Sequence, residues 1–324
     1  MIGTRLPLAF EAGLILPDDG PIAVWHPAGD ADLSTLHDPH VIQPFRPAHD
    51  LWCARGRLTS PEPEGPYSVS IVCLPRAKAE ARALIAAAME KTSDIVVLDG
   101  QKTDGADSML KAIRARHETS APISKAHGKL FWMEPTDAFA DWSAGPALTP
   151  GGFWTAPGVF SADGIDPASA MLVDALPSKL KGRIADLGAG WGYLSAHVLT
   201  RDAVTEVHLV EANHMALQCA EHNVTDQRAR FHWADATQWT IFEPLDAVVM
   251  NPPFHTERAG DPGLGQTFIA AAASLLKPSG QLWMVANRHL PYEATLASHF
   301  AKTVELGGDA RFKLLQVERP KRRS

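Results

Sequence analysis

The sequence predicts an α/β protein with two tandem domains, each a doubly wound, mainly parallel sheet with an antiparallel edge. Three observations lead to this fold class. The 324 residues exceed the length of one typical small domain. Strand-like and helix-like segments alternate through the C-terminal half, which is typical of parallel sheets covered by helices. A strand, a proline turn, an alanine-rich helix and a second strand also occur twice in the same order, which indicates an internal duplication.

The domain boundaries follow from local composition. Residues 136–165 are rich in proline and glycine and show no helical or strand period, so we predict a linker there. Its tryptophans and phenylalanines predict that it packs on the second domain. The domains on either side are residues 1–135 and 166–324.

The second domain begins with a helix over residues 166–176, because Asp166 can cap it and Pro167 suits its first position. Further helices are expected at 193–201, 214–224, 265–277 and 291–301. Strands are expected at 183–188, 206–212, 229–235, 246–251 and 280–287. The last two strands, 303–308 and 311–319, are predicted to form an antiparallel hairpin at one edge.

The first domain shows the same alternation of strands and helices, but with weaker patterns. Strands are expected at 21–27, 67–75, 93–101 and 128–135, and helices at 77–91 and 106–116. Residues 70–100 align with residues 247–287. The alignment places "CLPR" (73–76) opposite "NPPF" (251–254), so the first copy is predicted to be degenerate.

The composition excludes several classes of protein. The net charge is −7, and residues 1–150 hold 14 lysines and arginines against 19 aspartates and glutamates, a net charge of −5. This is no basic nucleic-acid footprint, so any RNA contact must come from a local patch. No apolar run is long enough to span a bilayer, and the N-terminus lacks a signal-peptide pattern.

The cysteines and histidines show no metal-ligand spacing, so we predict no metal. Cys53, Cys73 and Cys219 are interpreted as reduced, mostly buried thiols of a cytoplasmic protein. Four histidines are expected to be structural or exposed: His208, His214, His222 and His232.

A glycine loop, "IADLGAGWGYLS" (184–195), follows a predicted strand and opens a predicted helix. Gly188, Gly190 and Gly192 allow tight turns and close approach of the backbone to a ligand. Their spacing matches neither the dinucleotide fingerprint nor a P-loop. Trp191 is a candidate for the pocket wall or the core, and so is Trp233.

Three acids stand at the ends of three successive predicted strands, where such folds bind ligands. Asp186 suits an ammonium group, Glu211 suits two ribose hydroxyls, and Asp235 suits an adenine amine. Together these groups describe S-adenosylmethionine, so we predict a site for it. The alternative is that Asp186 caps a helix and Glu211 is surface charge. The site residues are Asp186, Gly188, Ala189, Gly190, Gly192, Glu211, Ala212, Asp235, Ala236 and Asn251.

The fourth strand ends in Asn251-Pro252-Pro253-Phe254, the predicted catalytic residues. The side-chain oxygen of Asn251 and the carbonyl of Pro252 can each accept a proton from one –NH2 group, and proline brings no competing N–H. Holding both N–H bonds directs the nitrogen lone pair toward a sulfonium methyl and stabilises the positive charge that grows on nitrogen. Phe254 can stack on a planar base or amide.

These motifs resemble the ribosomal RNA small subunit methyltransferase C family. The resemblance is carried by "PGVFSADGID" (157–166), the glycine loop, "NPPFH" (251–255), "GQLWMVANRHLPY" (280–292) and "ARFKLLQV" (310–317). It implies two tandem Rossmann-like methyltransferase domains with a degenerate N-terminal copy. It also implies methylation of guanine N2 in 16S rRNA, with the small ribosomal subunit or its RNA as partner. We further expect a monomer.

The resemblance implies that Phe160 packs near the cofactor or the target, although a simple hydrophobic anchor is an equal interpretation. His255 either relays a proton or only hydrogen-bonds at the rim. In the first domain, Arg76, Lys78 and Arg82 are expected to contact phosphates. Three other functions stay open: methylation of large-subunit rRNA, methylation of a protein glutamine, and a module that binds without catalysis.

Overall fold

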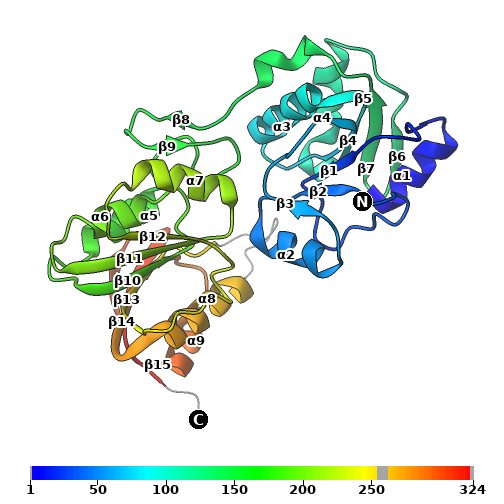
Figure 1. The fold of residues 1–324 in the computed structure, drawn as a ribbon. Coiled ribbons are helices and arrows are strands. Elements are labelled where there is room, and N and C mark those ends of the chain that lie inside the picture. The colour runs from blue at the N-terminus through cyan, green and yellow to red at the C-terminus, as the bar shows by residue number, and fades with distance from the viewer. Residues whose placement is uncertain (1, 254–261, 322–324) are drawn as a thin grey trace. The chain divides into compact units, whose positions relative to one another are not determined.

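The computed structural model describes residues 2–253 and 262–321, and the chain forms two compact units (Figure 1). Unit 1 comprises residues 1–145 and unit 2 comprises residues 146–324. Within the described parts of the chain, no helix is long and apolar enough to cross a membrane. The predicted cytoplasmic location and monomeric state stay predictions.

Unit 2 contains a seven-stranded sheet in the order β12-β11-β10-β13-β14-β16-β15. Neighbouring strands are parallel except that β16 runs antiparallel to both β14 and β15. The predicted antiparallel hairpin at one edge is therefore confirmed. The strands are β10 (Gly182–Leu187), β11 (Val204–Glu211), β12 (Ala229–Trp233), β13 (Leu245–Met250), β14 (Leu276–Asn287), β15 (Phe300–Gly308) and β16 (Phe312–Pro320).

Helices cover both faces of this sheet, because its central strands are apolar on both sides. On one face α5 (Pro167–Ala175), α6 (Tyr193–Val198) and α7 (His214–Asn223) share a hydrophobic core with the sheet. On the other face lie α8 (Pro262–Leu275) and α9 (Glu293–His299). The predicted cap of α5 is confirmed, since the Ser169 backbone N–H donates to Asp166 Oδ2 at 2.7 Å.

Unit 1 has a seven-stranded sheet in the order β3-β2-β1-β4-β5-β7-β6, which is the same arrangement. The predicted duplication is therefore confirmed at the level of topology. The strands are β1 (Ile22–Trp25), β2 (His40–Ile42), β3 (Thr59–Ser60), β4 (Tyr67–Cys73), β5 (Thr92–Gln101), β6 (Ile123–Lys125) and β7 (Gly128–Met133). The helices are α1 (Ile2–Glu11), α2 (Arg46–Ala54), α3 (Lys78–Lys91), α4 (Ala106–Arg114) and the 3₁₀ turn η1 (Lys102–Asp104).

The predicted linker is divided between the units. Its first part forms the 3₁₀ helix η2 (Asp137–Trp142), whose Phe139 and Trp142 lie in the core of unit 1 beside α3. Its later part forms the small hairpin β8 (Ala147–Leu148) and β9 (Trp154–Thr155) in unit 2. Composition predicted one segment that packs on the second domain, whereas the buried Phe139 and Trp142 attach its start to the core of unit 1, and Ala156 and Val159 pack its later part in unit 2.

Candidate functional site

The glycine loop runs between β10 and α6. The backbone N–H groups of Gly188 and Ala189 donate to the carbonyl oxygen of Val210, at 2.9 and 3.1 Å, and this fixes the loop beside β11. Gly190 has a φ of +54°, and a Cβ built there would meet no other atom within 4 Å. The loop therefore leaves open space at Gly190, as close approach by a ligand requires.

Gly192 serves a different purpose. A Cβ at this position would lie 3.0 Å from a methyl group of Val224 and 3.2 Å from the Cβ of Ala220. Its φ of +87° is also one that residues with a side chain rarely adopt. Gly192 thus allows α6 to start close against α7, and it does not line the pocket described below.

Glu211, at the end of β11, joins the glycine loop to the start of α7. Its Oε2 accepts from the backbone N–H of Gly190 at 2.8 Å, and its Oε1 accepts from that of Asn213 at 2.7 Å. Burial raises the pKa of this carboxyl, while the backbone N–H groups of Asn213, Gly190 and Ala212 act in the opposite direction. A carboxylate offers about four acceptor positions, so acceptor capacity remains for the predicted ribose hydroxyls.

Asp186 lies on β10 and is completely buried. The Ser195 hydroxyl donates to its Oδ2 at 2.7 Å, whereas no described residue donates to its buried Oδ1. Burial raises the pKa of this carboxyl to about 7. An unpaired buried carboxylate oxygen is unfavourable by itself, so it fits a site completed by a cationic group such as the predicted ammonium.

Asn251 follows β13 directly. Its side-chain Nδ2 donates to Asp166 Oδ2 at 3.0 Å and to Ser169 Oγ at 2.9 Å. These two acceptors fix the orientation of the amide. Its Oδ1 is buried and has no hydrogen-bond partner among the described residues. The amide is therefore held by its nitrogen and offers its oxygen as an acceptor.

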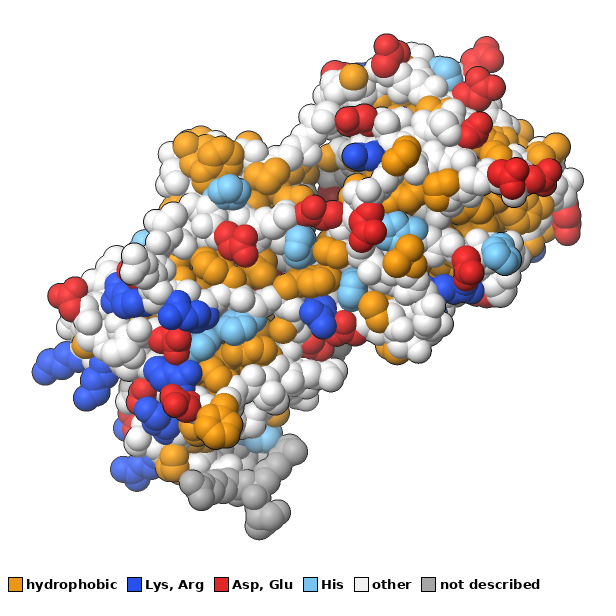
Figure 2. All heavy atoms as spheres, in the orientation of Figure 1, with side chains coloured by type: hydrophobic (Ala, Val, Ile, Leu, Met, Phe, Trp, Pro, Cys, Tyr) orange, Lys and Arg blue, Asp and Glu red, His pale blue; other side chains and the backbone are white. Residues whose placement is uncertain are grey.

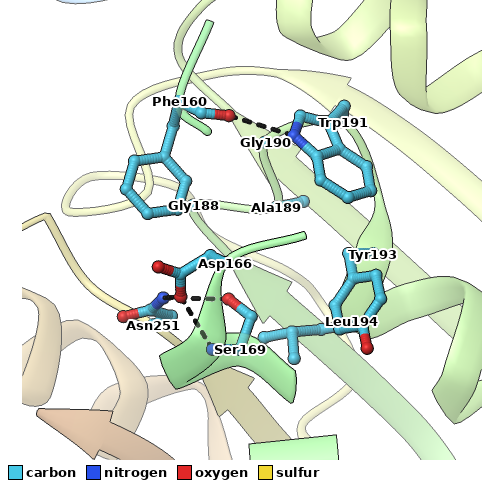
Figure 3. Close-up of a pocket in the computed structure, with 10 residues that line it drawn as sticks. All are labelled: Phe160, Asp166, Ser169, Gly188, Ala189, Gly190, Trp191, Tyr193, Leu194 and Asn251. Carbon is cyan, nitrogen blue, oxygen red and sulfur yellow. Dashed lines mark hydrogen bonds between the residues drawn. The ribbon is translucent and has the colours of Figure 1, made fainter. Parts of the chain in front are cut away.

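Asn251, Asp166 and Ser169 meet the glycine loop in one pocket, shown in Figure 3, whose lining does not include Asp186 or Glu211. Asn251 and Phe160 line it together with the glycine loop, and the Trp191 indole N–H donates to the carbonyl oxygen of Phe160 at 2.9 Å. Phe160 is 59% exposed. A side chain that served only as a hydrophobic anchor would be more deeply buried. The lining residues are Phe160, Asp166, Ser169, Gly188, Ala189, Gly190, Trp191, Tyr193, Leu194 and Asn251.

Several predicted site residues lie outside this lining. Asp235 closes a turn by accepting from the backbone N–H and the hydroxyl of Thr237, at 2.8 and 2.7 Å. Ala212 accepts from the Trp233 indole N–H through its carbonyl oxygen, and Ala236 is buried. Asp235 and Ala236 follow β12, which pairs with β11, so they lie near Glu211 at the carboxyl edge of the sheet. The roles proposed for these residues stay predictions.

In the predicted catalytic motif, Pro252 is buried and Pro253 is exposed. Phe254 and His255 lie outside the described residues. Asp166 and Ser169 were not predicted as site residues. The N-cap pattern revealed the local role of Asp166, but its bond to Asn251 spans 85 positions of sequence and has no local signal.

The sequence of the chain is similar to those of known methyltransferases. Residues 151–316 match the methyltransferase small domain family. The ribosomal RNA small subunit methyltransferase C of Shewanella sp. (strain MR-4) is 30% identical over 78% of this chain and 77% of its own length. That of Psychromonas ingrahamii is 30% identical over 78% of this chain and 76% of its own length. The chain belongs to the ribosomal RNA small subunit methyltransferase C family. This confirms the predicted resemblance and the prediction of a methyltransferase.

A solved family member also has the same fold. It is the Thermus thermophilus 16S rRNA N2 G1207 methyltransferase, determined in complex with AdoMet and guanosine. It superposes with a TM-score of 0.77 over 98% of this chain and 93% of its own, at 24% identity. Both units of the present chain are thus part of the family fold, including the unit predicted to be degenerate.

In unit 1, which is predicted to be degenerate, other contacts stand at the position that corresponds to the glycine loop. Gln43 follows β2 as Glu211 ends β11, and its Oε1 accepts from the Phe45 backbone N–H at 2.9 Å, as Glu211 does from Asn213. The Gln43 amide also donates to the carbonyl oxygen of Pro27 at 2.7 Å. The oxygen and the nitrogen of the Gln43 amide are thus both bonded to backbone groups of unit 1.

The counterpart of Asn251 in this unit is Cys73, at the end of β4. Burial raises the pKa of its thiol well above the usual range, so Cys73 is not an anion. A neutral thiol is only a weak acceptor. The loop after β1 carries His26 and Pro27 where unit 2 has glycines, and burial lowers the pKa of His26 to about 4.

The predicted phosphate-binding residues divide into two kinds. Arg76 and Lys78 are exposed where α3 begins. The Arg82 guanidinium instead lies over the ring of Trp142, with 4.9 Å between its central carbon and the ring centre. Arg82 therefore contributes to packing of η2, and only part of its guanidinium can face a phosphate.

The remaining sequence predictions concern cysteines, histidines and metals. Cys219 is buried and Cys73 is half-buried, but Cys53 is exposed on α2, which corrects the expectation of mostly buried thiols. His208 and His232 lie side by side, with 3.0 Å between Nδ1 and Nε2. Within residues 2–253 and 262–321, no group of three or more histidines, cysteines and acids could hold a metal ion.

Replacing Glu211 with glutamine is expected to weaken S-adenosylmethionine binding about tenfold, since a charge-assisted hydrogen bond contributes about 1.5–3 kcal/mol. Glutamine has one acceptor atom, whereas the loop presents two N–H donors, from Gly190 and Asn213. Calorimetric titration measures the dissociation constant. Glu221→Gln on the exposed side of α7 is the control, and equal affinity of the two variants would exclude this role.

Proposed function

We propose that this protein transfers a methyl group from S-adenosylmethionine to the exocyclic N2 amine of a guanine in 16S rRNA. The observation that carries the proposal is the Asn251 amide, whose nitrogen is fixed by Asp166 and Ser169 and whose buried oxygen has no described partner. A preorganised acceptor beside a glycine loop suits an amine acceptor for a methyl group. The family relatives named above support the choice of ribosomal RNA.

The chemistry follows from the groups that the chain supplies. S-adenosylmethionine provides an electrophilic methyl group on a sulfonium. The Asn251 oxygen and the Pro252 carbonyl accept the two N–H bonds of the guanine amine, which directs its lone pair out of conjugation with the ring. As the N–C bond forms, the S–CH3 bond would break and S-adenosylhomocysteine would leave. Positive charge grows on nitrogen meanwhile, and these oxygens stabilise it until one N–H proton leaves to solvent. Because N2 is enclosed in a base pair, the target guanine must be unpaired or flipped out of its helix.

The cofactor side of the site is supported by independent features of unit 2. Gly190 leaves open space, Glu211 retains acceptor capacity, and Asp186 has one buried oxygen that no described residue uses. These features suit a ribose and an ammonium group. We therefore assign the cofactor to unit 2.

RNA contacts on unit 1 must be local, because its net charge is negative. The charged side chains that Figure 2 shows on this unit are mostly aspartate and glutamate. Exposed Arg76 and Lys78 are candidates for phosphate contacts. We propose that unit 1 supports the fold and holds RNA at such places.

The test uses small ribosomal subunits from cells that lack the protein. With purified protein and S-adenosylmethionine labelled in its methyl group, we expect one N2-methylguanine in 16S rRNA, located by nuclease mapping and mass spectrometry. Label in large-subunit RNA or in a protein glutamine would identify one of the rival functions. No transfer to either subunit or to protein, with retained cofactor binding, would identify a binding module.

We predict that the whole chain binds one S-adenosylmethionine, although it contains two copies of the fold. In unit 1, Gln43 is satisfied by its own backbone and Cys73 replaces the catalytic amide. Calorimetric titration of the intact protein measures the stoichiometry. Two cofactors per chain would contradict the division of labour. A variant with Glu211→Gln would then show which unit holds the second molecule.

A further inference from the structure

Asp166 has a carboxylate oxygen that its structural role does not use. Its Oδ2 accepts both from the Ser169 backbone N–H at 2.7 Å, as the cap of α5, and from Asn251 Nδ2 at 3.0 Å. No described residue donates to its Oδ1. Because both N–H donors converge on Oδ2, the side chain is held in one orientation while Oδ1 stays available.

The free oxygen lies in the site itself. Asp166 and Asn251 both line the pocket beside the glycine loop. In Figure 3 the remaining oxygens of the two side chains point to the same side. The pocket thus presents two neighbouring acceptors on one rigid unit, one from a carboxylate and one from an amide.

We propose that Asp166 selects guanine by accepting a hydrogen bond from N1–H, while Asn251 holds the neighbouring N2 amine. This inference rests on the function proposed above and assigns its base specificity to a residue. Guanine carries the N1–H donor directly beside its amine, so its donors form a row that two adjacent acceptors can bind.

Other substrates with an –NH2 group lack an N–H donor directly beside it. Adenine has the unprotonated N1 beside its amine, cytosine has the unprotonated N3, and a glutamine side chain has its carbonyl oxygen. Each would place a lone pair against the Asp166 carboxylate. A bound substrate that covers an acceptor and leaves it without a hydrogen-bond partner binds much more weakly, so the site discriminates strongly against it. Asp166 therefore favours guanine both over other bases and over the rival glutamine substrate.

Asp166→Asn is the decisive substitution, because asparagine also caps helices. Its single oxygen must still accept from Ser169 and Asn251, so its –NH2 replaces Oδ1 in the pocket. The probes are guanosine and 2-aminopurine riboside, which keeps the 2-amine but has an unprotonated N1. Affinities are measured by ligand-observed nuclear magnetic resonance with S-adenosylhomocysteine present.

The wild-type protein is expected to prefer guanosine by about tenfold or more, and Asp166→Asn is expected to remove or reverse the preference. Asp163→Asn, three positions earlier and exposed, is the matched control and should keep it. Equal affinity of the wild-type protein for the two nucleosides, including failure to bind either, would overturn the inference, as would a variant with unchanged preference.

Methyl transfer to small ribosomal subunits separates this result from a failure of the proposed function. If the wild-type protein methylates guanine N2 in the subunits while Asp166→Asn keeps the nucleoside preference, only the role of Asp166 is wrong. If the wild-type protein methylates no guanine, the proposed function is wrong and this inference with it.

Discussion

Replacing Asn251 with alanine is expected to lower the rate of methyl transfer by about 10²–10³-fold, the effect of removing one preorganised group that stabilises charge in a transition state. The substitution removes the only side-chain oxygen that the proposed mechanism uses on the target amine. Its effect on S-adenosylmethionine binding is expected to stay within about twofold, because the contacts proposed for the cofactor's ammonium and ribose belong to Asp186 and Glu211. Single-turnover methylation and calorimetry measure the two quantities separately.

A second substitution perturbs the Asn251 amide less severely. Ser169→Ala removes one of the two acceptors that orient the Asn251 amide but leaves the bond to Asp166. We expect a smaller loss, of about fivefold, since one neutral hydrogen bond contributes about 1 kcal/mol. Activity of Asn251→Ala near the wild-type level would exclude the proposed catalytic role. An unaffected Ser169→Ala would show that Asp166 alone fixes the amide.

The parts of the site that are local in sequence could be predicted. The glycine loop, the asparagine-proline-proline turn and the Asp166 cap each depend on residues within a few positions of one another. The bond from Asp166 to Asn251 depends on β13 and the start of α5 lying together, which no local pattern encodes. The sequence therefore placed Asn251 at the end of the fourth predicted strand but did not show what orients its amide.

The missed elements of the fold have a similar cause. The strands β2, β3 and β6 contain only two or three residues, too few for a hydrophobic period to be visible. The helix α1 contains Pro7, and its Arg5 is buried in an ion pair with Asp99 of β5. A charged residue inside an apolar stripe obscures the helical pattern, and its partner lies 94 positions away.

The two units differ by few hydrogen bonds at the position of the glycine loop. Glu211 and Gln43 accept from the equivalent backbone N–H before α7 and α2. In unit 2 the second carboxylate oxygen of Glu211 accepts from a backbone N–H of the glycine loop. In unit 1 the Gln43 –NH2 instead donates to a backbone carbonyl oxygen, that of Pro27. The loop and the side chain thus match each other in both units, a carboxylate with the glycine loop in unit 2 and an amide with the loop of Pro27 in unit 1.

Asp186→Asn is expected to weaken S-adenosylmethionine binding about a hundredfold and to change its pH dependence. A charged hydrogen bond to the cofactor's ammonium contributes up to about 3 kcal/mol. Burial raises the pKa of Asp186 to about 7 in the unliganded protein. The bound ammonium favours the carboxylate, so binding below pH 7 must release a proton. Affinity should therefore rise with pH up to about 7 and then level off, and the asparagine variant should lack this rise.

The same substitution is expected to stabilise the unliganded protein at neutral and higher pH. Because the folded-state pKa of about 7 lies above the usual aspartate pKa of 3.8, the folded state holds this proton more tightly than the unfolded chain. The contribution of Asp186 to the free energy of unfolding thus falls as the pH rises from about 4 to about 7. Asparagine keeps an acceptor for Ser195 without the buried charge. Denaturant unfolding at pH 5 and pH 8, with and without cofactor, measures this. If the variant loses stability with pH as steeply as the wild-type protein, Asp186 is not the group responsible.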